Sequence, residues 1–115
     1  MKDRHIDSFK RLQDIEKAIA SIQKYVVTES YESFSKNEVV HDAVLFQFSV
    51  IGEAIIHVEK AKLVKYNYPW YKVRSFRNMI AHEYFIVKLI AVWEIIKTDL
   101  PKLKEIINSM LQNEF

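Results

Sequence analysis

The stretch NEVVHDAVLFQFSVIGEAIIHVEK, residues 37–60, decides the fold. Its apolar residues recur every three or four positions, which is the period of an amphipathic helix. One apolar stripe contains Val40, Val44, Phe48, Ile51, Ile55 and Val58. A second apolar line contains Val39, Phe46, Val50 and Ala54. Because the two lines make the helix apolar on more than one side, the helix must be buried on more than one side.

Two arrangements bury such a helix. Its second face can lie in an interface with another copy of the chain, most simply an isologous dimer, which we favour. Alternatively, the helix can be the centre of a bundle formed by its own chain. Gly52, the only glycine, lies in the middle of this helix, where it costs up to about 1 kcal/mol relative to alanine. We therefore expect another helix to come close at Gly52.

The same periodicity continues on both sides of this helix. Further helices are predicted at about residues 3–26, 69–84, 86–98 and 101 to near the C-terminus, with connectors at 28–33 and 61–68. Asp3 is predicted to cap the first helix, Ser35 or Asn37 the second, and Pro69 to begin the third. Pro101 is expected to kink or restart the last. The 115 residues thus predict one all-α domain, residues 1–115, folded as a four- to five-helix antiparallel bundle.

Composition excludes several classes of protein. The chain has no cysteine, so it has no disulfide, no thiolate zinc site and no cysteine nucleophile. Its charged N-terminus has no apolar signal core, and no apolar stretch reaches about 18 uninterrupted residues, so we expect a cytoplasmic protein without a membrane span. Glu53 and His57 are four positions apart, but no further ligand is spaced to complete a metal site. No metal or cofactor is expected.

Residues 77–84, RNMIAHEY, carry the only candidates for chemistry. Arg77 is a permanent cation whose fork matches phosphate oxygens, and His82 can move a proton near neutral pH. Together they suit phosphodiester chemistry without a metal. A simpler interpretation also stays open: Arg77 forms a surface ion pair, His82 is a hydrogen-bonded residue at a helix end, and Tyr84 is a packing residue.

The spacing of these residues raises a geometrical problem. Arg77 and Tyr84 are seven positions apart and would share one face of a helix. Arg77 and His82 are five positions apart and would point about 140° away from each other. Either the helix breaks near His82, or the arginine and the histidine of one site meet by another route, such as pairing across two subunits.

Positive charge is concentrated around this motif. Residues 60–82 contain six lysines and arginines and no aspartate or glutamate, although the whole chain has a net charge of only +2. Such a patch attracts a polyanion, and we interpret Lys72 and Arg74 as RNA-binding residues. The alternative is a basic face that meets an acidic face of the same fold or of a partner.

Two segments together resemble the HepT-like family, the small HEPN-domain proteins that prokaryotes encode beside minimal nucleotidyltransferases. The segments are FSKNEVVHDAVLFQFSVIGEAI (34–55) and PWYKVRSFRNMIAHEYFIVKLIAVWEII (69–96). They share a mid-helix Gly-Glu-Ala, a Pro-Trp opening, the Arg-x4-His-x-Tyr signature and a later Trp-Glu. The chain departs from the family pattern after Tyr84, where residues 85–88 replace the usual glycine-containing turn.

This resemblance implies a dimeric helical bundle that acts as a metal-independent ribonuclease toxin. Its antitoxin partner would be the nucleotidyltransferase. Arg77 and His82 correspond to the catalytic pair, Asn78 and Glu53 to supporting residues, and Tyr84 to the tyrosine that the antitoxin can modify with adenylate. The alternative is a catalytically silent module that binds a nucleotidyltransferase or nucleic acid.

Overall fold

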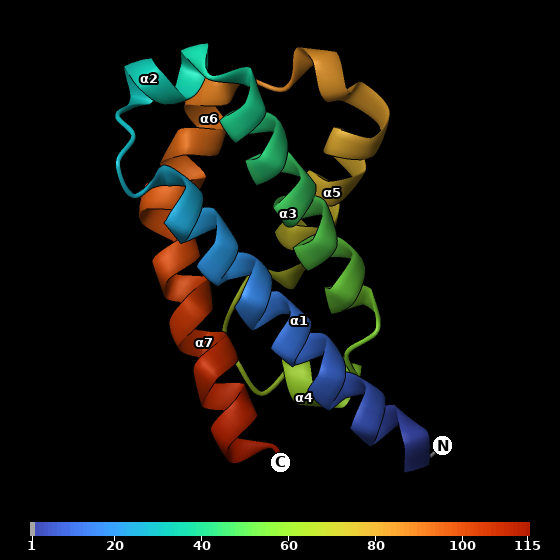
Figure 1. Ribbon diagram of the computed structural model, residues 1–115. Coiled ribbons are helices and arrows are strands. Elements are labelled where there is room, and N and C mark those ends of the chain that lie inside the picture. The colour runs from blue at the N-terminus through green and yellow to red at the C-terminus, as the bar shows by residue number, and fades with distance from the viewer. Residues whose placement is uncertain (1) are drawn as a thin grey trace.

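A computed structural model describes residues 2–115, and every regular element in this range is a helix, with no strand (Figure 1). The elements in order are α1 (Lys2–Val26), α2 (Tyr31–Lys36), α3 (Glu38–Ile56), α4 (Lys60–Leu63), α5 (Trp70–Glu83), the 3₁₀ helix η1 (Tyr84–Ile86), α6 (Leu89–Glu94), the π-helical segment η2 (Ile95–Asp99) and α7 (Leu100–Asn113). The predicted all-α class is confirmed.

The helix α3 lies at the centre of the bundle. It packs against α1 on one side and α5 on the other, while α7 packs against α1. Neighbouring long helices run antiparallel, and α6, η2 and α7 form one continuous arm (Figure 1). The largest fully buried side chains of the core include Leu12, Ile15, Ile19, Ile22, Phe34, Ile51, Leu100, Ile107 and Met110.

The broad apolar surface of α3 is covered only in part. The length and apolar composition of α3 would allow it to cross a membrane, but core helices of soluble proteins can have the same length and composition. The buried residues of α3 pack against α1 and α5. Within the second apolar line, Ala54 is buried, but Val39 and Phe46 are 79% and 64% exposed. The chain therefore wraps most of α3 by itself and leaves part of one face open.

Several helix boundaries differ from the predictions. Part of the predicted connector forms the short helix α2, because Ser30 and Ser33 bond each other's backbone N–H in a capping box. The first helix already includes Lys2, so Asp3 lies in its first turn. The predicted second helix corresponds to α3, which ends at Ile56 rather than near Lys60. The segment predicted as a linker after it contains most of the short helix α4. These differences lie at helix ends and leave the bundle unchanged.

Pro101 does not interrupt the continuous helical rod formed by α6, η2 and α7. It lies in the first turn of α7, directly after the π-helical segment η2. Proline has no N–H, and its ring would clash with the carbonyl of the residue four positions earlier in a regular α-helix. The wider π turn provides the extra space, as such bulges do inside helices. The predicted helix near residues 86–98 and the last helix are therefore one rod with a local bulge.

Asn37 caps α3, as predicted for this position. Its side-chain oxygen accepts a hydrogen bond from the N–H of Val40 at 3.2 Å. We expect Asn37→Ala to lower the free energy of unfolding by about 1 kcal/mol, because an N–H at the start of α3 loses its acceptor. Urea unfolding followed by circular dichroism measures this. Asn67→Ala, at an exposed loop position, is the control and should change stability by less than about 0.5 kcal/mol.

Candidate active site on α5

Gly52 sets how closely α5 approaches α3. A Cβ atom built at Gly52 would overlap the Cβ atom of Arg77, lie 2.7 Å from the Cγ atom of Arg77 and lie 3.2 Å from the backbone oxygen of Val73. No side chain fits in this space. The structure therefore gives the predicted packing reason for the only glycine: α5 rests on the bare backbone of α3 at Arg77.

This close approach places Arg77 beside acidic and polar groups. One Arg77 guanidinium nitrogen donates to Glu53 Oε1 at 2.9 Å, and the other donates to Asn78 Oδ1 at 3.1 Å. Both partners are the residues that the resemblance marks as supporting. The Arg77 side chain is one third exposed and that of Glu53 about half exposed. The guanidinium is thus held in place yet remains accessible to an anion.

His82 lies on the same helix but not beside Arg77. The helix α5 continues without a break to Glu83, so His82 projects about 140° away from Arg77. Its side chain is exposed. The α-helix does end near His82, at Glu83, but this end comes one residue after His82 and so does not turn His82 towards Arg77. A single chain presents the two residues on different sides of α5.

Tyr84 is fixed against α3 by a contact that the sequence interpretation did not name. Its hydroxyl donates a hydrogen bond to Oδ1 of Asp42. This bond, partial burial and the negative charge of Asp42 raise the pKa of Tyr84 to about 12. Arg77 and Tyr84 thus both face α3, as their seven-residue spacing predicts. The contact holds the junction of α5 and η1, two residues beyond His82.

The contact with Asp42 predicts an unusually high pKa for Tyr84. The absorbance difference between the wild type and Tyr84→Phe should show a phenol with a pKa near 12 instead of about 10. Because the folded state raises this pKa, the stability from the contact is fully present below about pH 10 and is lost as the pH rises towards 12. In Asp42→Asn the Tyr84 pKa should fall towards 10. A Tyr84 midpoint near 10 in the wild type would contradict the contact.

The basic segment is partly neutralised by acidic residues from elsewhere in the fold. Lys62 pairs with Glu59, Lys65 pairs with Glu114 at 2.9 Å, and Arg77 pairs with Glu53. Among the described residues, the other three cations, Lys60, Lys72 and Arg74, have no ion pair. The alternative interpretation, in which the basic segment meets acidic groups of the same fold, therefore accounts for half of these charges, and binding of a polyanion by the other half stays a prediction. Lys72 and Arg74, the predicted RNA-binding residues, are exposed.

The remaining candidate ligands do not form a cluster. His57 Nε2 lies 3.4 Å from Glu53 Oε2, so these two residues share the α3 face that also contacts Arg77. Across residues 2–115, no three histidine, aspartate or glutamate side chains come together in a group that could hold a metal ion. Glu53 instead contacts both neighbours, with Oε1 towards Arg77 and Oε2 towards His57.

Fold and site together define a small α-helical protein whose Arg-x4-His-x-Tyr signature lies at the end of one helix and is supported by the central helix. The family model described as "Ribonuclease HepT-like" matches residues 15–110, so the chain belongs to this family. The matched range includes every predicted site residue.

The chain is similar to several curated proteins whose names include RNase or ribonuclease. A "Gamma-glutamylcyclotransferase and putative RNase" of Methanocaldococcus jannaschii is 33% identical over 88% of this chain, which spans only 46% of that protein. A "Putative RNase" of the same organism is 30% identical over 91% of this chain and 95% of its own length. A "Probable ribonuclease HepT" of Thermococcus cleftensis is 30% identical over 90% of this chain and 93% of its own length. No solved structure gives a significant match.

Proposed function

We propose that the chain is a metal-independent endoribonuclease with Arg77 and His82 as its catalytic residues. The observation that carries this proposal is the pair itself: a supported, accessible guanidinium and an exposed imidazole on one helix of a HepT-like ribonuclease fold. The names of the relatives support RNA as the substrate class. We place the activity in the cytoplasm.

The proposed chemistry is acid–base cleavage of the RNA backbone. A neutral His82 accepts the proton of the 2′-hydroxyl as its oxygen attacks the adjacent phosphorus. Arg77 stabilises the negative charge that develops on the phosphate oxygens. A protonated His82 then gives its proton to the leaving 5′-oxygen. A single imidazole would have to perform both roles in turn, whereas two copies of His82 in different protonation states can divide them.

We propose that a second copy of the chain supplies the other imidazole. Arg77 and His82 project about 140° apart on α5, so a site containing both needs residues from two subunits. Exposed apolar side chains lie near this end of the bundle: Val39 and Phe46 on α3, and Phe85, which is 97% exposed, on η1. An isologous dimer through this surface would bury them and place two Arg–His pairs around one phosphate.

We further propose that the ribonuclease is a toxin controlled at Tyr84 by a minimal nucleotidyltransferase. Tyr84 is partly exposed and lies at the same end of α5 as His82. An adenylate on this oxygen would remove the proton that Asp42 accepts and would place a phosphodiester charge beside that carboxylate. The junction of α5 and η1 would then have to move, and His82 with it.

A catalytically silent binding module is the second candidate. It is favoured by the ion pair of Arg77 with Glu53, because a structural role for Arg77 needs no more than this contact. Such a module would present Tyr84 and the basic residues to a nucleotidyltransferase or to nucleic acid.

RNA cleavage in the presence of EDTA separates the two candidates. The purified protein is mixed with a labelled single-stranded RNA, with and without EDTA, and the products are separated on a gel. The ribonuclease proposal predicts equal cleavage in both reactions. Cleavage that EDTA abolishes contradicts the metal-independent mechanism. No cleavage in either reaction, with tight binding of a nucleotidyltransferase, supports the silent module.

A further inference from the structure

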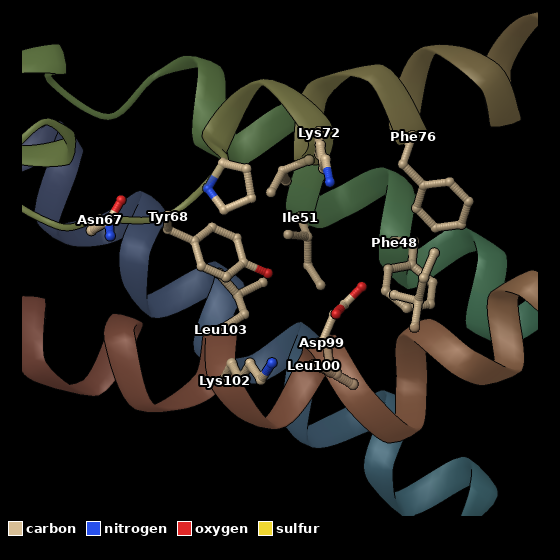
Figure 2. A pocket seen from close by; sticks show the side chains of 13 residues that line it. Phe48, Ile51, Asn67, Tyr68, Lys72, Phe76, Asp99, Leu100, Lys102 and Leu103 are labelled. Atoms are coloured by element: carbon tan, nitrogen blue, oxygen red, sulfur yellow. The ribbon is translucent and has the colours of Figure 1, made fainter.

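A cleft separates α5 from the arm formed by η2 and α7. It has a volume of about 380 Å³ and arises because α5 packs mainly against α3, leaving space between α5 and α7. Phe48 and Ile51 of α3 form its floor, and Phe76 and Leu103 form part of its apolar walls (Figure 2). This size lies in the range of small-ligand sites, which are mostly apolar with a few polar groups.

Charged groups surround the apolar floor. Lys72 of α5 and Lys102 of α7 lie on opposite sides of the cleft, and the carboxylate of Asp99 points towards its centre (Figure 2). None of the three has an ion pair within the described part of the chain. Their charges are therefore available to a ligand.

The π-helical segment that accommodates Pro101 also lines the cleft. Asp99 is the last residue of the π-helical segment η2, and Ile95, the first residue of this segment, also lines the cleft. Single π turns inside α-helices are rare and occur frequently at functional sites, because they change the direction of the side chains they carry. Here the π turn faces the cleft.

Aromatic rings complete the cleft. The ring of Tyr68 extends into it from the segment before α5, and its hydroxyl points towards the centre (Figure 2). Burial and the charge of Asp99 raise the pKa of Tyr68, so the hydroxyl stays a donor. Phe76 and Phe48 pack edge to face at 5.1 Å in the wall and floor. Flat apolar surfaces of this kind accept a stacked base.

We propose that this cleft binds one nucleotide of the RNA chain, at a position away from the cleaved bond. The base lies between Tyr68 and the apolar floor, an amino group of the base donates to Asp99, and a phosphate lies between Lys72 and Lys102. The proposal rests on the proposed function, which supplies RNA as the ligand. Lys72 and Arg77 are five positions apart on α5, so the cleft and Arg77 lie on different sides of that helix.

Asp99 gives the subsite a base preference. Adenine, cytosine and guanine carry an exocyclic amino group that can donate to a carboxylate, whereas uracil carries none. We expect cytidine monophosphate to bind several times more tightly than uridine monophosphate. In Asp99→Asn this difference should disappear, since the amide no longer offers a charged acceptor.

Binding, measured separately from cleavage, tests the subsite. An RNA with 2′-O-methyl groups, which cannot be cleaved, is titrated into the full-length chain at several salt concentrations. Lys72→Ala/Lys102→Ala should weaken binding about tenfold and lower the slope of log K against log salt by about 1, as expected for one released phosphate contact. Lys104→Ala, also on α7 but outside the cleft, should change neither quantity.

Nuclear magnetic resonance locates the ligand. Addition of cytidine monophosphate or of the methylated RNA should shift the amide signals of Tyr68, Phe76 and Leu103. Binding of RNA that is unchanged in the double lysine variant, or shifts that avoid the cleft, would overturn the proposal. Shifts with the mononucleotide alone would assign the cleft to a free nucleotide and would also overturn it.

The subsite and the nuclease can fail independently. If the wild type binds RNA in the cleft but does not cleave it, the nuclease proposal is ruled out and the subsite stands. If the wild type cleaves RNA but binds it no more tightly than the double lysine variant does, the subsite is ruled out and the nuclease proposal stands.

Discussion

Replacing His82 with alanine is expected to lower the rate of RNA cleavage by on the order of 10²-fold or more, because proton transfer to and from the RNA oxygens is lost. His82 is exposed, so the variant should keep the circular dichroism spectrum and the unfolding midpoint of the wild type. His5→Ala is the matched control: His5 is also exposed, lies near the start of α1, and should leave the rate unchanged. Undiminished cleavage by His82→Ala would eliminate the mechanism.

Mixing two inactive variants tests whether the site is shared between subunits. Arg77→Ala and His82→Ala homodimers each lack one kind of catalytic group. A mixed dimer contains one intact Arg77 and one intact His82, which come from different chains. Because this dimer restores one Arg–His pair but keeps only one of the two imidazoles that divide the acid and base roles, we expect the mixture to recover a part of the activity well below that of the wild type, with a rate that depends on protein concentration. If the mixture is no more active than either variant alone, the shared site is ruled out.

Gly52→Ala is expected to destabilise the protein by about 1–3 kcal/mol, the usual cost of overpacking a closely packed site. Alanine in a helix normally stabilises relative to glycine by up to about 1 kcal/mol, so helix propensity alone predicts the opposite sign. The sign reverses because the new Cβ would overlap the side chain of Arg77 and crowd the backbone of Val73. Urea unfolding measures the change.

The same substitution should impair cleavage beyond its effect on folding. Separating α5 from α3 moves Arg77 away from Glu53, which now holds its guanidinium. At a temperature where the variant is fully folded, we expect a lower cleavage rate. Ser49→Ala, one turn earlier in α3, is the control and should change stability by less than about 0.5 kcal/mol. A Gly52→Ala protein as stable and as active as the wild type would contradict the close contact at Arg77.

Periodicity was sufficient to predict the long helices, because each buries an apolar stripe that the sequence shows directly. The apolar face of α1 and the core stripe of α3 are examples, and the need for a close neighbour at Gly52 followed from its position alone. The short helix α2 was missed because its formation depends on two serines that cap each other rather than on a periodic stripe. The π turn was missed because it depends on how Pro101 is accommodated in three dimensions.

The sequence predicts which residues form the candidate site, but it does not predict which of them contact one another. Arg77, Asn78 and Glu53 do come together, although Glu53 and Arg77 are 24 positions apart in sequence. Asp42 was missed, yet a signal existed. Asp42 and Glu53 are 11 positions apart, about three turns, so they share one face of α3. An antiparallel α5 on that face brings Tyr84 to one carboxylate and Arg77 to the other.

The attachment of α5 to the rest of the bundle has a consequence for motion. This helix carries Arg77 and His82 but packs mainly against α3, with the cleft on its other side. Its backbone N–H groups should therefore exchange with deuterium sooner than those of α1, which packs against both α3 and α7, and those of α3, which packs against α1, α2 and α5. The segment with the chemistry would then be the one that opens at the lowest free-energy cost, so a bound RNA or a second protein could reshape it without disturbing the core.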